Sequence, residues 1–151
     1  MSPHRERALL IVAGLYAVAV ALVTVVPLRA TNDGATRVSL APLGSIRRCI
    51  PGHDGQRDSP GSCVRNLAGN VLLFVPFGVL FALGVGPHRR TFGAVLMWAV
   101  ITSAAIELVQ WQERRFHVGR TVDVDDVLWN AVGAGAGYWL VIASAAARRS
   151  R

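Results

Sequence analysis

The feature that most constrains this sequence is the gathering of its apolar residues into four long blocks. The blocks cover residues 8–27, 66–86, 91–111 and about 123–147. Each is about 20 residues long, the length that a helix needs to cross a hydrocarbon core about 30 Å thick. Hydrophobic residues make up 52% of the chain, more than an average soluble domain contains. The sequence therefore predicts an all-α, polytopic membrane protein: a single domain of four transmembrane helices in an antiparallel bundle.

The connections between the blocks are polar. The second and third blocks are joined by Pro87, His88, Arg89 and Arg90, and such a short connection implies antiparallel neighbours. Residues 28–65 read as a polar loop, too short and turn-rich to bury a core of its own, and residues 112–122 as a polar link. The basic start before an apolar run also fits a signal peptide. We favour a retained helix, because the first block exceeds a usual signal core and Leu28 stands where the best cleavage site needs a small residue.

The positive charge of the chain fits membrane anchoring. The net charge is +7 and the isoelectric point about 11.2, which in a soluble protein would raise nucleic-acid binding. Here the basic residues are arginines that flank the apolar blocks, so we expect no nucleic-acid partner. Four spans place both chain ends on one side. The arginines of that side lie tight against the helix ends, which favours cytoplasmic termini.

Two cysteines, Cys49 and Cys63, share the first polar loop. The residues between them are rich in glycine and proline, so the loop can bring the two thiols together. If it faces an oxidising exterior they could form a disulfide; two free thiols are the alternative. A zinc site is disfavoured, because His53 alone lies nearby and a closed zinc site needs four ligands.

Polar side chains interrupt the apolar blocks towards one side of the membrane. An ionisable group at membrane depth is costly and commonly marks a functional site. Glu107 lies about one turn inside the third block, with Gln110 three residues further on the same face. It is read equally well as a site acid or as the partner of an arginine.

The fourth block carries its polar residues on one face. Asp123, Asp126 and Asn130 fall within an arc of roughly 60° on a helical wheel, whereas Asp125 and Trp129 project elsewhere. Gly133 and Gly137 lie on or next to the same arc, where small residues allow a neighbouring helix to approach closely. This face is expected to look into the bundle.

The second block and the 112–122 link add further polar groups. Asn66 and Asn70 open the second block, where they either bond to neighbouring helices or contact a substrate or ion. Pro76 frees a backbone carbonyl near the middle of the block. Arg120, with Arg65, Arg114 and Arg115, lies near the mouth of the inferred bundle. The candidate ligand-binding residues are thus Asn66, Asn70, Glu107, Gln110, Arg120, Asp123, Asp126 and Asn130.

This polar mouth has two interpretations. Glu107, Asp123 and Asp126 are the candidates for catalysis or metal binding, and Mg²⁺ or Ca²⁺ would suit their oxygen ligands. Arg120 would suit a phosphate or carboxylate. In the alternative, Arg120 pairs with one of these acids, and the cluster is an internally neutralised plug that fixes the fold.

Three segments together resemble the VanZ-like family. They are NLAGNVLLFVPFG (66–78), SAAIELVQ (103–110) and GRTVDVDDVLWNAVGAGAG (119–137). The resemblance implies a multi-pass protein of the bacterial plasma membrane, in a family named for a factor that lowers susceptibility to the glycopeptide teicoplanin. The family's characteristic polar residues correspond here to Asn70, Glu107, Gln110, Arg120, Asp126 and Asn130, with Asp123 a further candidate. The arginine-rich first loop with its two cysteines departs from the family pattern.

We favour a non-catalytic role in the cell envelope. The polar mouth would bind a membrane lipid, a lipid-linked glycan or cell-wall precursor, or a partner protein, with glycopeptide resistance as one consequence. The alternative is an enzyme acting on an envelope lipid or lipid-linked sugar, with Glu107, Asp123 or Asp126 as base or metal ligand. The sequence shows no evident nucleophile paired with a base. A small transporter is a third reading, which requires several copies; the sequence leaves a homo-oligomer open.

Overall fold

The computed structural model describes residues 2–25, 38–39, 43–49, 60–84, 90–113 and 122–150. Most of them belong to four long helices: α1 (Pro3–Val25), α3 (Pro60–Gly84), α4 (Phe92–Glu113) and α5 (Val124–Arg149). All four are long and apolar enough to cross a membrane, which confirms the predicted helical membrane fold. The other described elements are a short helix, α2 (Gly44–Cys49), and two strands of two residues, β1 (Val38–Ser39) and β2 (Val122–Asp123).

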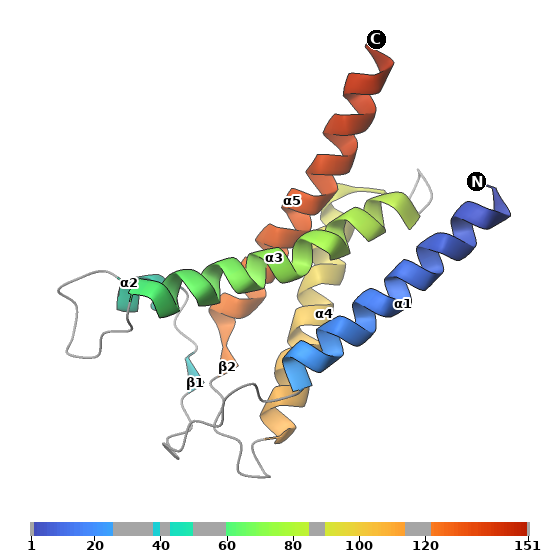
Figure 1. Cartoon of the computed structure of the whole chain (residues 1–151). Helices are drawn as coiled ribbons and strands as arrows, with labels where there is room; N and C mark the ends of the chain where they lie inside the picture. Colours follow the sequence, from blue (N-terminus) through green and yellow to red (C-terminus); the bar gives the residue numbers. More distant parts are fainter. Residues whose placement is uncertain are drawn as a thin grey trace.

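The long helices are arranged so that the two chain ends lie on the same side. Figure 1 shows both chain ends on the side where α3 ends and α4 begins, with the last turns of α5 projecting beyond the other helices, whereas α2 and both strands lie at the left. This arrangement is consistent with the expected antiparallel bundle. We call the end formed by α2, the strands and the first turns of α3 and α5 the capped end.

Helices α3 and α5 form the closest contact of the fold. A Cβ atom on Gly133 or Gly137 would overlap the backbone carbonyl of Val71 or Val75 on α3. Gly78 makes the reciprocal contact, since a Cβ there would overlap the carbonyl of Ala134. The close approach predicted from Gly133 and Gly137 is thus confirmed.

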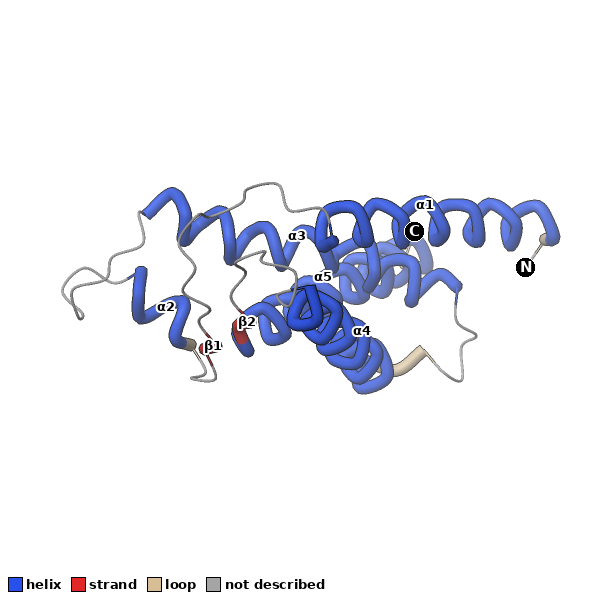
Figure 2. Tube along the Cα trace, turned by 90° about the horizontal axis from the view of Figure 1, so that it is seen from below, coloured by secondary structure: helices blue, strands red, loops and turns tan. Residues whose placement is uncertain are grey.

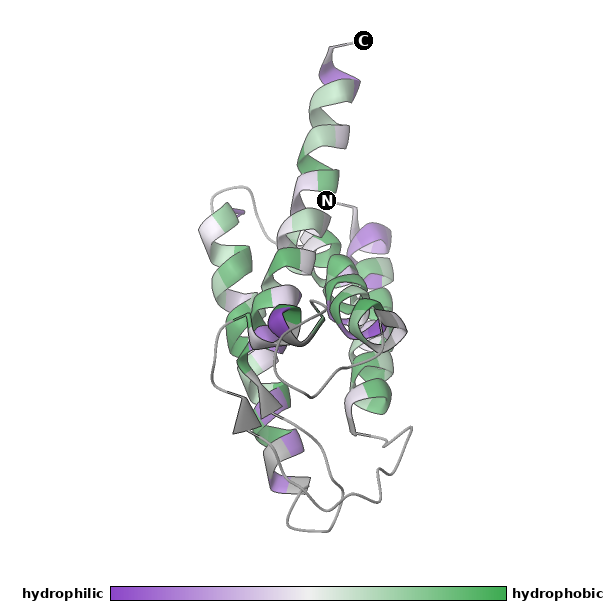
Figure 3. Cartoon of the chain, turned by 90° about the vertical axis from the view of Figure 1, so that its left-hand side faces the viewer, coloured by the Kyte–Doolittle hydropathy of each residue, from purple (hydrophilic) through white to green (hydrophobic). Residues whose placement is uncertain are grey.

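Helix α4 packs against this pair and completes a small core. Phe74, Val95, Ala99, Ala134 and Tyr138 are buried together. The Tyr138 hydroxyl donates a hydrogen bond to the Arg90 carbonyl over 3.1 Å, which ties α5 to the residues just before α4. Figure 3 shows apolar residues over most of the length of the helices, as expected for membrane spans.

Helix α1 lies to one side of the other three, as Figure 2 shows. It is the least buried of the four spans. The Tyr16 hydroxyl donates to the Leu73 carbonyl on α3 over 2.8 Å. Thr24 lies buried near the C-terminal end of α1, and its hydroxyl donates to the Val20 carbonyl one turn earlier. Contacts with the core are therefore few.

The prediction that residues 28–65 form a polar loop is wrong in part. Helix α2 and strand β1 lie within it, and α3 begins at Pro60 rather than at residue 66. Proline suits the first position of a helix, because it lacks an N–H that would have no partner there and its φ is already helical. The apolar pattern begins only after Arg65, so it marks the start of the apolar span, not of the helix.

The fourth helix begins within one residue of the expected start at about residue 123. Strand β2 pairs in parallel with β1, in the register Val38 with Val122 and Ser39 with Asp123. Helix α5 begins directly after it, at Val124, so the backbone of Asp123 belongs to the strand. A strand of two residues has too little alternation to be recognised in a sequence.

We expect the Gly137→Val variant to be strongly destabilised, because its side chain would have to displace the α3 backbone at Val75. Overpacking of this kind costs about 1–3 kcal/mol. Thermal unfolding of the detergent-solubilised protein measures the loss. The matched control is Gly69→Ala on α3, where a Cβ meets nothing within 4 Å and the gain in helix propensity should leave stability equal or higher. Equal melting of both variants would contradict a backbone contact at Gly137.

Candidate functional site

Two of the predicted polar residues, Asn70 and Asp126, are in contact in the structure. The Asn70 Nδ2 atom donates a hydrogen bond to the Asp126 Oδ1 atom, joining α3 to α5. Asp126 lies in the first turn of α5, where the helix dipole favours a carboxylate. Both residues are half-buried. This pair fastens the two helices about two turns from the Gly133 contact.

The interface of α4 and α5 carries three buried polar side chains. The Asn130 Nδ2 atom donates to the Ser103 hydroxyl over 2.7 Å, and Glu107 lies one turn beyond Ser103 on the same face of α4. Ser103 is 0%, Asn130 5% and Glu107 9% exposed. Within the described residues, the Asn130 Oδ1 atom has no hydrogen-bond partner. These side chains lie inside spans, where no water competes for the hydrogen bond between Asn130 and Ser103.

Gln110 connects α4 to α1. Its Nε2 atom donates to the Thr24 carbonyl over 3.3 Å. Since Thr24 lies in the last turn of α1, this bond holds the end of that helix towards the core. Asn70, Gln110 and Asn130 thus each reach a different helix, so these three members of the predicted mouth are engaged in contacts between helices.

Asp125 is the important polar residue that the sequence interpretation missed. Its side chain is 0% exposed, and its Oδ1 atom accepts a hydrogen bond of 2.6 Å from the Leu43 backbone N–H. Leu43 has a φ of 61°, in the left-handed region that a side chain such as leucine rarely adopts. The helical wheel placed Asp125 away from the other acids, which is correct for α5, but could not show that the first loop returns to cover it.

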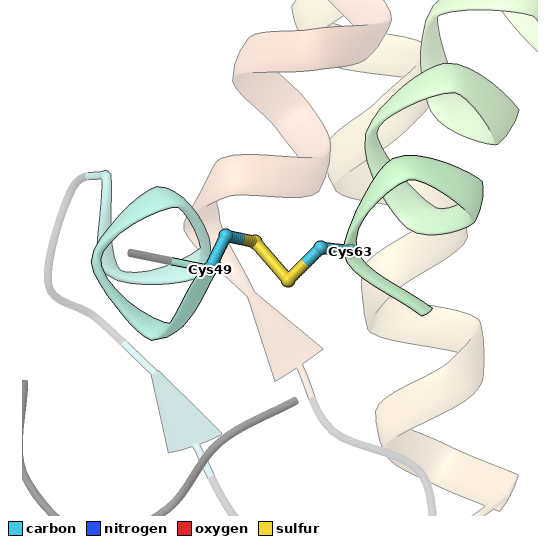
Figure 4. The surroundings of a disulfide bond; sticks show 2 residues. All are labelled: Cys49 and Cys63. Carbon is cyan, nitrogen blue, oxygen red and sulfur yellow. A yellow bond between two sulfur atoms is a disulfide. The ribbon is translucent and has the colours of Figure 1, made fainter. Parts of the chain in front are cut away.

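A disulfide ties the same loop to α3. Figure 4 shows the bond between Cys49, the last residue of α2, and Cys63, in the first turn of α3. The two Cα atoms are 5.8 Å apart. Together with the Leu43–Asp125 bond and the pairing of β1 with β2, the disulfide fixes the first loop across the start of both α3 and α5.

The remaining candidates do not join this network in the described residues. Asn66 is exposed. Arg120, Arg114 and Arg115 lie outside the described residues, and of Asp123 only the backbone in β2 is described. No group of three His, Cys, Asp or Glu side chains that could hold a metal occurs among the described residues. The proposed Mg²⁺ or Ca²⁺ site therefore stays a prediction.

The fold and these contacts define a multi-pass membrane protein whose helices are joined by polar side chains at one end. The model of the VanZ/LLP1 family matches residues 13–145, so the chain belongs to this family, as the three segments of the sequence had indicated. The match covers most of the chain and includes every polar contact between helices described above. No curated protein and no solved structure matches the chain.

We expect Ser103 and Asn130 to be energetically coupled. A double-mutant cycle with Ser103→Ala and Asn130→Ala should give a coupling of about 0.5–2 kcal/mol, as measured for hydrogen bonds between membrane helices. Unfolding of the four proteins in mixed detergent measures it. Ser144→Ala is the control, because the exposed Ser144 hydroxyl bonds only within its own helix among the described contacts. Additive effects of the two core substitutions would contradict the bond.

Reduction of the Cys49–Cys63 bond should release the first loop from α5. We expect faster hydrogen exchange at the Leu43 amide and a loss of about 3 kcal/mol of stability, the value for a closed loop of about 15 residues. Exchange is measured by mass spectrometry with and without reductant. The Cys49→Ser/Cys63→Ser double variant is the control, because reductant should not change its exchange. If the Leu43 amide kept its protection in both reduced and double-variant protein, the loop would be held independently of the disulfide.

Proposed function

We propose that this VanZ-like protein is a non-catalytic factor of the bacterial cell envelope that binds an anionic, phosphate-bearing lipid or lipid-linked glycan precursor at its capped end. The observation that carries the proposal is the Cys49–Cys63 disulfide at that end. Disulfides persist in oxidising compartments and are rare in the cytosol. The bond therefore favours a capped end that faces outward from the plasma membrane, with both chain ends in the cytoplasm.

The charge near the disulfide supports an anionic ligand. Arg47 precedes Cys49 by two residues and Arg65 follows Cys63 by two, and both are exposed. Because the two cysteines are bonded, the two arginines are kept at the same end of the molecule. They are the exposed charged side chains of the capped end as far as it is described. Guanidinium groups bind phosphate through paired hydrogen bonds.

The polar contacts between helices support binding rather than catalysis. Asn70, Asp126 and Asn130 are engaged with neighbouring helices, so they would serve as the rigid support of the capped end. A phosphate-bearing precursor held at the surface above them would alter how glycopeptides such as teicoplanin reach the envelope. Resistance to glycopeptides would then be a consequence of binding.

We expect the Arg47→Ala/Arg65→Ala variant to lose affinity for phosphatidylglycerol, on the order of tenfold, since basic residues at a membrane surface each contribute to the attraction of anionic lipids. Native mass spectrometry of the detergent-solubilised protein with added phosphatidylglycerol measures the affinity. The matched control is Arg148→Ala/Arg149→Ala, which removes two exposed arginines from the opposite end. An equal loss in both variants would contradict a site at the capped end.

The orientation has its own test. After mild reduction of intact cells, a membrane-impermeant maleimide should label Cys49 and Cys63. Labelling confined to lysed cells would overturn the outward-facing capped end.

The resistance role is tested by growth in the presence of teicoplanin. Expression of the wild-type protein should raise the inhibitory concentration of teicoplanin in a susceptible host, and expression of the Arg47→Ala/Arg65→Ala variant should not.

A further inference from the structure

An apolar groove separates α1 from α3 and α4. Its volume is about 540 Å³, within the range of roughly 300–1,000 Å³ typical of ligand pockets. The α1 wall carries alanines at every fourth position, Ala13, Ala17 and Ala21, and the α3 wall carries Phe74, Phe77 and Phe81. Small side chains usually let membrane helices approach closely, but here they face aromatic rings across an open space.

The walls of the groove offer almost no free polar atoms. The Tyr16 hydroxyl is bonded to the Leu73 carbonyl, and the Thr24 hydroxyl to the Val20 carbonyl. An occupant with polar groups along its length would find few partners for them, and burying such groups without partners is costly. The groove is therefore suited to a hydrocarbon chain.

The length of the groove matches one leaflet of a membrane. On α1 it extends from Ala13 to Thr24, a distance of about 16 Å at 1.5 Å per residue. Half of a hydrocarbon core is about 15 Å thick. Thr24 is the end nearest the polar network, since its carbonyl accepts the bond from Gln110. A chain in the groove would thus begin near the capped end and end near the middle of the membrane.

The weak attachment of α1 leaves the groove accessible from the membrane. α1 is the least buried span, and its hydrogen bonds to the other spans include one from the Tyr16 hydroxyl to α3 and one from Gln110 to the Thr24 carbonyl. Between these two bonds the α1 wall of the groove consists of Ala17, Val20 and Ala21. Lipid chains surround α1, so a hydrocarbon chain can enter sideways without crossing a polar barrier.

We infer that the groove among α1, α3 and α4 is a binding site for one hydrocarbon chain of an envelope lipid from the leaflet at the capped end. This deepens the proposed function and rests on it for the headgroup, because the chain would belong to the lipid whose phosphate the capped end binds. The groove itself would recognise the chain whatever the headgroup.

The test uses the delipidated, detergent-solubilised full chain and phosphatidylglycerol that carries a photoreactive diazirine on one acyl chain. We expect one probe per chain, attached to α1, α3 or α4 at groove residues. Ala17→Phe and Ala105→Phe fill the groove and should reduce this attachment on the order of tenfold, the effect of losing about 1.4 kcal/mol of binding. Their controls are Ala19→Phe and Ala104→Phe, exposed positions on the same helices outside the groove, which should label like the wild type.

The outcomes separate the groove from the headgroup site. A phosphatidylcholine probe with the same acyl chain should still label the groove. The groove of the Arg47→Ala/Arg65→Ala variant should also be labelled, even though this variant no longer prefers phosphatidylglycerol to phosphatidylcholine. Attachment spread over all helices and unchanged by Ala17→Phe would overturn the groove site. So would a dimer, seen by light scattering, that Ala17→Phe dissociates, because the groove would then belong to a second copy of the chain.

Discussion

The structure depends on the backbone contact between α3 and α5 at Gly78, Gly133 and Gly137. Inside a membrane there is no hydrophobic force between helices, because lipid chains are as apolar as leucine, so close packing and hydrogen bonds must hold them together. Bare glycine surfaces allow the two backbones to touch. That contact sets the distance at which Asn70 reaches Asp126 and places the first turns of both helices side by side, where the first loop can cover them.

The polar network follows from this packing. Asn70, Ser103 and Asn130 each need a partner at membrane depth, and the nearest partners lie on neighbouring helices. Helix α1 has no glycine contact of this kind: Gly14, its one glycine, has nothing within 4 Å of an added Cβ. Its hydrogen bonds to the other spans include that of the Tyr16 hydroxyl with the Leu73 carbonyl and that of the Thr24 carbonyl with Gln110. The same difference explains why the apolar groove lies beside α1 and not between α3 and α5.

Much of the scaffold could be predicted from the sequence, because a period of 3.6 residues and a block of about 20 apolar residues are local signals. They located the spans and the shared face of Asp126, Asn130, Gly133 and Gly137. What could not be predicted depends on contacts between distant segments. The helical wheel places Asp125 on another face than Asp126 and Asn130, but it cannot show that the Leu43 backbone N–H, 82 positions earlier, donates to the Asp125 side chain. The β1–β2 pair likewise joins distant segments, and the groove depends on how α1 lies beside α3 and α4, which the spacing of the α1 alanines alone does not reveal.

Different parts of the chain therefore carry stability and specificity. Asn70 and Asn130 bond to side chains on neighbouring helices, so a change at either residue would disturb the packing of the spans. The first loop and the start of α3 supply both cysteines and the exposed Arg47 and Arg65. A common set of spans can then present different surfaces, since binding residues on loops are positioned by a rigid scaffold. Under the proposed function, the spans supply the scaffold, while the ligand would be selected by the loop and by the groove beside α1.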